Sequence, residues 1–307
     1  MNELGGTDRH LLIVGCGYSG TVLAQRTSFK GIPTIGTTRS EQRAHVIRTR
    51  GAQPVLFDGT NYDALRRFRG RLAGIVYSIP PRMTPDGDAP YEDATAEFMQ
   101  HIADWGVAHF VYISSTSVYG DKGGATVTES SETTPDSPRG KARLAIEAQV
   151  LAGPVSASVI RPAGIYGPGR SQLHRIAKGA YKLVGDGDAY TNRIHVVDLA
   201  ALIEAALRRA EPGAIYLGTD TAPTTQKAVV DHIVETYGLP APPAMPLDEA
   251  RVRLSKNVLA MIRGSKQLDP TQTLADLKVR LRYPDFAKGL ADIWRREAKA
   301  IKALAAP

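Results

Sequence analysis

Short segments that are apolar at consecutive positions alternate with amphipathic segments along the first two thirds of the chain. The apolar segments have the length of buried strands and cover residues 10–15, 33–38, 54–57, 74–78, 109–114 and 158–162. Consecutive rather than alternating apolarity indicates strands that helices cover on both faces, as in a parallel sheet. A last strand, 214–218, follows the helical pattern "VVDLAALIEAALRRA". This βαβ order predicts an α/β fold of the Rossmann type, with a doubly wound parallel sheet.

The pattern changes after residue 220. The segment "LPAPPAMP" (239–246) predicts a linker or surface loop, whereas residues 225–237 and 286–304 have helical patterns. We therefore expect two units. A Rossmann domain would comprise residues 1–165 with 194–220, and a smaller C-terminal substrate lobe would comprise residues 166–193 with 221–307.

Composition narrows the class of protein. The 38 Lys and Arg residues exceed the 31 Asp and Glu residues by a net charge of +7, spread along the chain. This favours anionic ligands such as a phosphorylated cofactor, with no nucleic-acid footprint. No apolar run approaches the ~20 residues of a membrane span. Cys16 is the single cysteine, and "HLLIVG" is too short for a signal peptide, so we expect a cytoplasmic protein without membrane partners.

A glycine-rich loop follows the first predicted strand. In "GCGYSG", Gly15, Gly17 and Gly20 have G-x-G-x-x-G spacing, and Tyr18 and Ser19 open the next helix. In this context the first glycine allows a tight turn, the second allows close approach of a pyrophosphate, and the third allows close packing of helix on strand. The helix N-terminus adds unpaired N–H donors for the phosphates. The loop predicts a dinucleotide site.

The end of the second strand indicates which dinucleotide binds. No acidic residue is present there to bind the ribose hydroxyl of NAD; instead the sequence has Thr38, Arg39 and Ser40. Arg39 can bind a phosphate by charge-assisted hydrogen bonds, so NADP is favoured over NAD. The alternative is that Arg39 is a solvated loop residue. Asp58, after the third strand, would meet the adenine amine or would cap the next helix.

Three further motifs, "YISSTSVYG" (112–120), "VIRPAGIYGPG" (159–169) and "RIHVVDLA" (193–200), carry a family resemblance. With the glycine loop, they resemble the extended and atypical short-chain dehydrogenases/reductases, especially the NAD(P)-dependent epimerase/dehydratase or nucleoside-diphosphate-sugar epimerase group. The resemblance implies that Ser115 hydrogen-bonds the reacting substrate oxygen. It further implies a row of residues along the cofactor, namely Ser78, Ile79, Ser114, Pro162 and Ile165.

The family's Tyr-x-x-x-Lys motif is altered in this chain. Aligning "SPRGKARLAIE" (137–147) on Gly140 and Glu147 places Arg139 at the tyrosine and Arg143 at the lysine. Arg143 can still orient the cofactor, whereas a guanidinium has no proton to exchange near neutral pH. A shifted register would instead pair Ser137 with Lys141. Tyr166 is a candidate substitute proton donor, with a structural role as the alternative.

The resemblance also implies substrate contacts from Arg170, Asn192, Arg193 and His195, although a structural histidine is the alternative for the last. No set of His, Cys, Asp or Glu has metal-ligand spacing, so we expect no metal. The leading hypothesis is an NADP-dependent oxidoreductase or epimerase/dehydratase acting on a polar small molecule such as a nucleotide sugar. The alternatives are an NADP-binding sensor without catalysis and a protein that uses the same fold for non-redox chemistry. A homodimer is compatible with each hypothesis.

Overall fold

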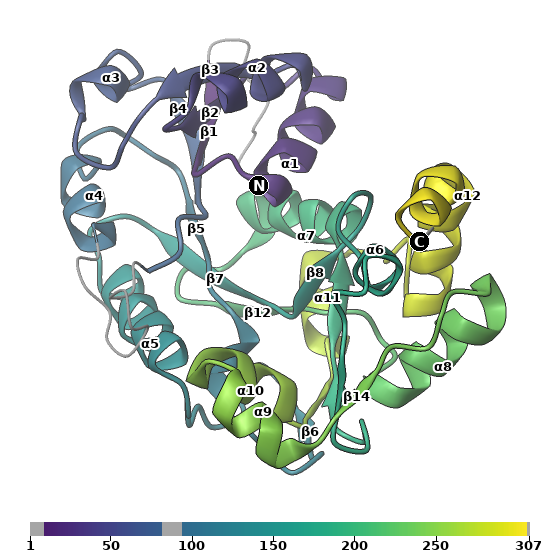
Figure 1. Cartoon of the computed structure of the whole chain (residues 1–307). Helices are drawn as coiled ribbons and strands as arrows, with labels where there is room; N and C mark the ends of the chain where they lie inside the picture. The colour runs from purple at the N-terminus through teal and green to yellow at the C-terminus, as the bar shows by residue number, and fades with distance from the viewer. Residues whose placement is uncertain (1–8, 82–93, 306–307) are drawn as a thin grey trace.

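The computed structural model describes residues 9–81 and 94–305. At its centre lies a seven-stranded sheet in the order β12-β7-β5-β4-β1-β2-β3, with all neighbouring strands parallel (Figure 1). The strands are β1 (His10–Val14), β2 (Thr34–Thr38), β3 (Gln53–Leu56), β4 (Leu72–Tyr77), β5 (Phe110–Ile113), β7 (Ala157–Pro162) and β12 (Ile215–Gly218). The predicted doubly wound Rossmann sheet is confirmed.

The inner strands are largely apolar at consecutive positions because they supply both faces of the sheet, whereas the edge strand β3 is exposed at Gln53 and Leu56. In β1, Leu11 and Ile13 join the apolar core on one face, whereas Leu12 and Val14 join the core on the other face. All four are fully buried. Alternate side chains of a strand point to opposite faces, so a strand covered on both sides needs no polar position.

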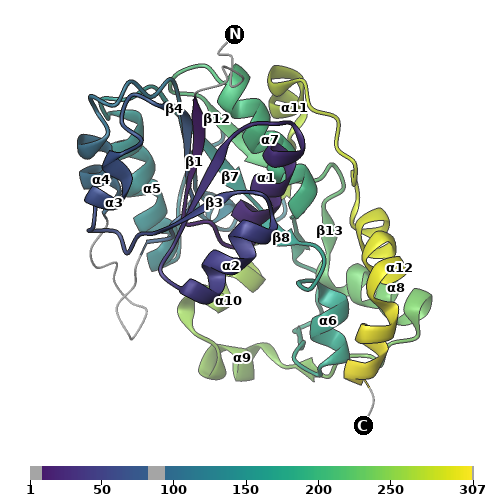
Figure 2. The ribbon, with the colours of Figure 1, turned by 90° about the horizontal axis from the view of Figure 1, so that it is seen from above.

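Helices cover both faces (Figures 1 and 2). One core includes side chains from α1 (Tyr18–Phe29), α2 (Glu41–Thr49), α7 (Val196–Arg209) and α11 (Thr271–Leu277). The opposite core includes side chains from α3 (Asp63–Arg66), α4 (Thr95–His101) and α5 (Pro138–Leu151). The loops at the carboxyl ends of the strands are thereby left for ligands, as in other open α/β sheets.

The C-terminal region has an apolar core of its own, shared by α6 (Gln172–Ala177), α8 (Gln226–Tyr237) and α12 (Phe286–Ala305). Helices α9 (Leu247–Arg253) and α10 (Lys256–Arg263) form a smaller cluster beside β9 (Leu183–Val184) and β14 (Ala244–Met245). The remaining short elements are β6 (Thr126–Val127) with β15 (Gln267–Leu268), β8 (Gly164–Tyr166) with β11 (Arg193–His195), β10 (Tyr190–Thr191) with β13 (Thr224–Thr225), and the 3-10 helix η1 (Thr116–Tyr119). Since α11 packs in the Rossmann layer, the region after residue 220 contributes to both units.

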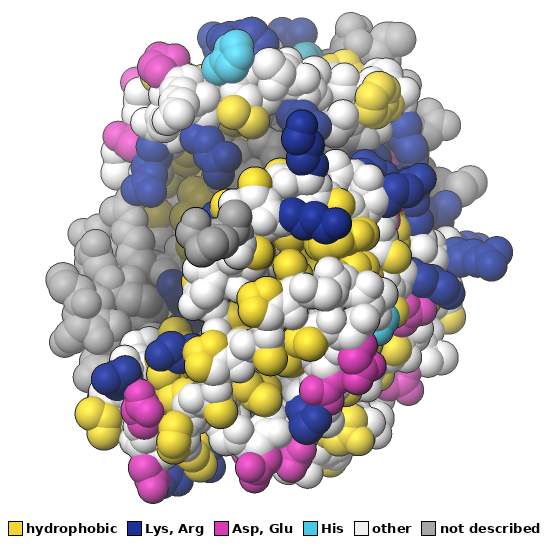
Figure 3. Space-filling view, turned by 45° about the vertical axis from the view of Figure 1, so that its right-hand side comes forward, with side chains coloured by type: hydrophobic (Ala, Val, Ile, Leu, Met, Phe, Trp, Pro, Cys, Tyr) yellow, Lys and Arg dark blue, Asp and Glu magenta, His cyan; other side chains and the backbone are white. Residues whose placement is uncertain are grey.

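The surface reflects the basic composition. In Figure 3, Lys and Arg side chains are concentrated in the upper part of the face shown, and Asp and Glu lie mainly in its lower half. Among the described residues, no helix combines the length and the apolar character that crossing a bilayer requires.

Candidate functional site: the dinucleotide cleft and the end of strand β5

The glycine loop joins β1 to α1, and each glycine is needed for a different reason. Gly15 has φ of +79°, a conformation that side chains other than glycine rarely adopt. A Cβ at Gly20 would lie 3.1 Å from Ile13 Cγ2 and 3.3 Å from Cys16 Sγ. At Gly17, by contrast, only the Gly15 carbonyl oxygen comes within 4 Å, at 3.9 Å. Helix α1 starts directly after this open position, so the loop fits a pyrophosphate at the helix N-terminus.

The single cysteine lies inside this loop as a packing residue. Cys16 is buried, and a Cβ at Gly36 on β2 would lie 2.9 Å from its sulfur. Burial raises the pKa of the Cys16 thiol to about 12, although the charge of Arg43 lowers it in part. The thiol is therefore protonated at neutral pH and is no nucleophile.

The end of β2 supports the loop and presents two arginines. Thr37 Oγ1 accepts a hydrogen bond of 2.9 Å from the Gly15 N–H, which fixes β2 to the loop. Ser40 caps α2 by accepting from the Arg43 N–H. Arg39 and Arg43 are exposed, and neither guanidinium has a partner within the described ranges. Arg43, one helical turn after Arg39, is a candidate phosphate ligand that the sequence analysis missed.

Asp58 lies at the exposed edge of the same cleft. Its Oδ1 accepts hydrogen bonds from the Thr60 and Asn61 N–H groups and from the Thr60 hydroxyl. These bonds lower the pKa of Asp58 to about 2. Asp58 therefore organises the turn before α3, close to the capping role considered above, while the N-cap position of α3 itself is Tyr62.

The opposite wall of the loop comes from strands β4 and β7. Ile79 follows β4, and its Cγ1 would lie 2.8 Å from a Cβ at Gly15, so it packs directly on the turn. Ser78 donates its N–H to the Val14 carbonyl. Pro162 ends β7, and Ile165 lies on β8 and is partly buried against the core of the sheet. These positions lie at the carboxyl ends of the strands, where the sequence analysis places the cofactor.

Tyr18 and Arg170 connect the glycine loop to the segment after β8. The Tyr18 hydroxyl donates a 3.0 Å hydrogen bond to the Pro168 carbonyl, and the Arg170 guanidinium lies 5.4 Å from the Tyr18 ring centre. Ser19 is half-buried in the first turn of α1. Arg170, predicted to contact substrate, thus lies beside the first turn of α1.

Arg143 reaches from α5 to the carboxyl end of β5. Its Nη1 donates to the Ile113 carbonyl at 2.6 Å and to the Tyr112 hydroxyl at 3.1 Å. Its Nε is buried and has no hydrogen-bond partner among residues 9–81 and 94–305. Arg143 thus lies at the carboxyl end of β5, and its Nε–H is a buried donor without a partner among the described residues. Its role in place of the family's lysine stays a prediction.

A buried ion pair holds α5 to the sheet beneath Arg143. Arg161 on β7 donates to both carboxylate oxygens of Glu147, with Nη2–Oε2 at 2.7 Å, and its Nη1 donates to the Tyr119 hydroxyl at 2.8 Å. Ser114 donates its hydroxyl to Glu147 as well. Ser114, predicted to contact the cofactor, is therefore committed to this network. All four side chains are buried.

Ser115 directly follows Ser114, which the hydrogen bond to Glu147 holds in place. Its Oγ accepts a 3.2 Å hydrogen bond from the Ser117 N–H, and the residue is only partly buried. A hydroxyl that accepts from the backbone keeps its own proton to donate. Ser115 therefore has a hydroxyl proton free to donate, and its contact with a substrate oxygen stays a prediction.

The start of α5 replaces the missing tyrosine with an exposed charge. Arg139 is exposed, and its backbone N–H donates to the Asn257 side chain on α10. Ser137 is the N-cap of α5 and accepts from the Gly140 N–H at 3.1 Å, while Lys141 is exposed. In the shifted register, the hydroxyl of Ser137 is used to cap α5 and the amine of Lys141 lies at the surface. The two side chains therefore form no proton-exchanging pair at the end of β5.

Tyr166 lies inside the lobe core. Its hydroxyl is buried, has no partner among the described residues, and would lie 1.9 Å from a Cβ at Gly289 of α12. Burial raises the pKa of the Tyr166 hydroxyl well above its usual range. This environment favours the structural alternative over a role as proton donor.

The other predicted substrate residues also have partners within the fold. The side-chain amide of Asn192 donates to the Lys266 carbonyl and accepts from the Leu268 N–H. Arg193 is buried beside Asp220 and donates to Thr191. Burial raises the pKa of Asp220 to about 7, although the Arg193 charge opposes the shift. These side chains join the lobe to the sheet, so their polar groups are largely used by the fold.

His195 caps α7 from a buried position. Its Nδ1 accepts from the Val197 N–H, and its ring lies 5.2 Å from the Tyr166 ring centre and 4.0 Å from that of Tyr283. Burial lowers the pKa of His195 to about 4, with Asp292 opposing the shift and Arg296 and Arg282 adding to it. His195 is therefore neutral near pH 7, which favours the structural histidine over an imidazolium acid.

His195 should make stability depend on pH. Its pKa of about 4 lies below the 6.5 of the unfolded chain. Its contribution is therefore complete above pH 6.5 and is lost as pH falls toward 4. Between pH 7 and pH 4, the wild type should lose about 3 kcal/mol more unfolding free energy than His195→Gln. Urea unfolding of both proteins at each pH measures the difference; parallel pH profiles would show that His195 titrates normally.

The comparisons with known proteins agree with this architecture. Protein YeeZ of Escherichia coli K12 is 27% identical over 286 residues, covering 90% of this chain and 97% of YeeZ. A functionally unknown conserved protein from Silicibacter pomeroyi is 31% identical, with a TM-score of 0.81, covering 94% of this chain and 99% of its own. A ketoreductase of Stigmatella aurantiaca, named for a farnesyl dihydroquinoline-oxide substrate, is 24% identical over 242 residues, or 74% of this chain and 72% of the enzyme.

The family assignment rests on the first two thirds of the chain. Residues 11–218 match the model of the NAD dependent epimerase/dehydratase family. That range contains the central sheet, apart from His10 at the start of β1, together with the glycine loop, Ser115 and α5. The chain therefore belongs to the NAD dependent epimerase/dehydratase family.

Proposed function

We propose that this chain is an NADP-dependent oxidoreductase that reduces the carbonyl group of a polar small molecule. The observation that carries the proposal is the arrangement of the cleft. An open glycine position lies at the start of α1, and the exposed, unpartnered guanidinium groups of Arg39 and Arg43 flank the N-cap of α2. Two guanidinium groups and a serine hydroxyl suit a phosphate dianion better than a ribose hydroxyl.

The dinucleotide, when bound, would supply the hydride, and the chain's own residues would bind and polarise the substrate. Ser115 donates a hydrogen bond from its hydroxyl to the substrate oxygen, because its own oxygen already accepts one from the Ser117 N–H. Arg143 is held by the Ile113 carbonyl and keeps one N–H for the cofactor's ribose. Arg139 adds a fixed positive charge at the exposed start of α5, where it stabilises negative charge developing on oxygen.

Carbonyl reduction fits this site better than epimerisation or dehydration. The latter reactions need a base that removes a proton from a sugar hydroxyl, and the guanidinium of Arg139 cannot accept one near neutral pH. Reduction needs only a proton for the product alkoxide, which solvent at the exposed start of α5 can deliver. The match to a ketoreductase supports the same choice. A sugar-nucleotide ketone is one substrate of this class.

The cofactor preference is tested by removing both arginines. In Arg39→Gln/Arg43→Gln, NADPH should bind at least about 100-fold more weakly, since each of the two charge-assisted contacts contributes about 1.5–3 kcal/mol. NADH affinity should stay within about twofold, because NADH lacks the 2′-phosphate. Quenching of cofactor fluorescence measures both. The control Arg66→Gln/Arg251→Gln removes the same charge from exposed pairs on α3 and α9 and should leave both affinities unchanged. Equal losses for NADPH and NADH would contradict NADP preference.

A test of the catalytic role of Ser115 distinguishes the enzyme hypothesis from the sensor hypothesis. In Ser115→Ala, turnover of a carbonyl substrate should fall about 100-fold, the usual cost of a lost oxyanion donor, while NADPH affinity is unchanged. Oxidation of NADPH against a panel of ketones and aldehydes provides the assay. Ser130→Ala, an exposed serine, is the control. Tight NADPH binding by the wild type with no turnover on the panel would instead support the sensor hypothesis.

A further inference from the structure

A basic cavity lies in the helical layer on one side of the sheet, between α1, α7 and the chain that follows α11. Its volume is about 470 Å³. Lys30, at the end of α1, lies about 18 Å from the glycine loop, the length of a 12-residue helix. The cavity is therefore separate from the dinucleotide cleft. Its basic lining residues are Arg26, Lys30, Arg208, Arg209, Lys278 and Arg280.

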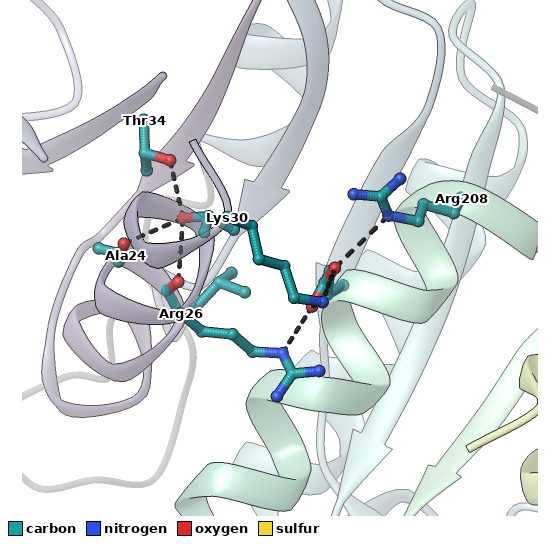
Figure 4. Close-up of polar contacts among 8 residues, drawn as sticks. Ala24, Arg26, Lys30, Thr34 and Arg208 are labelled. Atoms are coloured by element: carbon teal, nitrogen blue, oxygen red, sulfur yellow. Dashed lines mark hydrogen bonds and ion pairs between the residues drawn. The ribbon is translucent and has the colours of Figure 1, made fainter. Parts of the chain in front are cut away.

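One carboxylate organises this cavity. Glu204 of α7 is buried, and it binds Arg26 Nε at 2.5 Å, Lys30 Nζ at 2.6 Å and Arg208 Nε at 3.5 Å (Figure 4). Burial alone would raise the pKa of Glu204, but the hydrogen bonds from Lys30 and Arg26 outweigh it, so the pKa lies below its ordinary value. Glu204 is ionised and fixes three cations, while it neutralises only one of their charges.

The excess positive charge has no carboxylate to balance it within the cavity. Glu204 is the single acidic residue among the lining residues, and the exposed Arg209, Lys278 and Arg280 add further charge at the rim. The Nε of Arg208 is buried, and its ion pair with Glu204 at 3.5 Å is its sole described contact and is not a hydrogen bond. Such convergent cations favour an anionic ligand.

The backbone at the rim gives an independent indication. Lys278 has φ of 53° and is the only non-glycine residue with positive φ in the described ranges. It ends α11 at a position where glycine is the usual residue. A residue held in a rarely populated conformation often marks a functional site. Here the conformation belongs to a residue that lines the cavity.

We propose that this cavity binds a compact polyphosphate. Four of its basic side chains are arginines, whose planar forks match phosphate oxygens. Several separated cations suit a ligand with more than one phosphate group. The uncharged lining consists only of Ala201, Ala205 and Val279, with no aromatic ring to stack on a base. Recognition therefore rests on the phosphate chain, whether it is free or attached to a nucleoside.

Calorimetric titration with sodium tripolyphosphate and with ATP tests the proposal on the full chain. The protein is first saturated with NADPH, or with NADH if NADPH fails to bind, so that the glycine loop is occupied. One equivalent of tripolyphosphate should bind in 0.15 M salt, and ATP should bind within about threefold of it, because no lining residue contacts a base. Arg209→Gln/Arg280→Gln should weaken both by at least tenfold.

Two control variants locate the effect. Arg66→Gln/Arg251→Gln removes equal charge from α3 and α9, and Arg39→Gln/Arg43→Gln removes it from the dinucleotide cleft. Both should bind tripolyphosphate like the wild type, and all variants should keep the wild-type Tm without ligand. No binding by the wild type, equal weakening in all three variants, or loss only in the cleft variant would overturn the proposal. ATP binding more than tenfold tighter than tripolyphosphate would overturn recognition through phosphate alone.

Discussion

Replacing Glu147 by glutamine is expected to lower the free energy of unfolding by about 3–5 kcal/mol, because it leaves a buried arginine without its counter-charge. The Arg161 and Glu147 side chains are only 4% and 3% exposed. Glutamine keeps the shape of the side chain, so the loss measures charge and hydrogen bonding rather than a cavity. Urea unfolding followed by circular dichroism gives the value. The exposed Glu132→Gln is the matched control and should change stability little.

A double-mutant cycle identifies the cause. Glu147→Leu/Arg161→Leu should be more stable than either single variant, since a buried apolar pair carries no uncompensated charge. If the losses of the single variants add up in the double variant, the two side chains do not stabilise each other. The double variant should still lose activity, because α5 carries Arg143 and the network also holds Ser114, next to Ser115.

Replacing Gly17 by valine is expected to weaken dinucleotide binding by at least about 100-fold while the protein stays folded. A Cβ at Gly17 would meet only the Gly15 carbonyl oxygen, at 3.9 Å, so the fold leaves room for a side chain at this position. The fold therefore accepts a side chain that the pyrophosphate cannot, because the second glycine of the motif leaves room for phosphate. Fluorescence titration with NADPH measures the loss, and thermal unfolding without ligand should give a Tm close to that of the wild type.

The third glycine of the loop provides the comparison. A valine at Gly20 would press on Ile13 and Cys16, so Gly20→Val should lower Tm even without ligand. If Gly17→Val instead lowers Tm as much as Gly20→Val, glycine at position 17 is required for folding rather than for dinucleotide binding. If Gly17→Val binds NADPH normally, the pyrophosphate lies elsewhere.

The sheet could be predicted from sequence because its signals are local. Each strand is a run of apolar residues between turn signals, and the glycine loop follows β1 directly along the chain. The position of Arg143 could also be predicted, since α5 is one continuous amphipathic helix that packs on the sheet.

The parts that could not be predicted depend on contacts between distant residues. Glu147 on α5 marked the register of the motif, but its partner Arg161 belongs to strand β7. Asn192 and His195 have the residue types of a substrate site, yet burial and contacts with residues more than 70 positions away occupy Asn192 and enclose His195. Arg43 was missed because its distance from the glycine loop depends on how β2 turns into α2.

The hydrogen bond from Tyr18 to the Pro168 carbonyl makes the glycine loop and the lobe part of one mechanical unit. The first turn of α1 is the proposed phosphate site, and residue 168 lies between β8 and α6, the first helix of the lobe. If the lobe shifts when substrate binds, this hydrogen bond would carry the displacement to the glycine loop. Thermodynamic reciprocity would then require each ligand to change the affinity of the other by the same factor. The two binding steps would in that case be coupled through Tyr18.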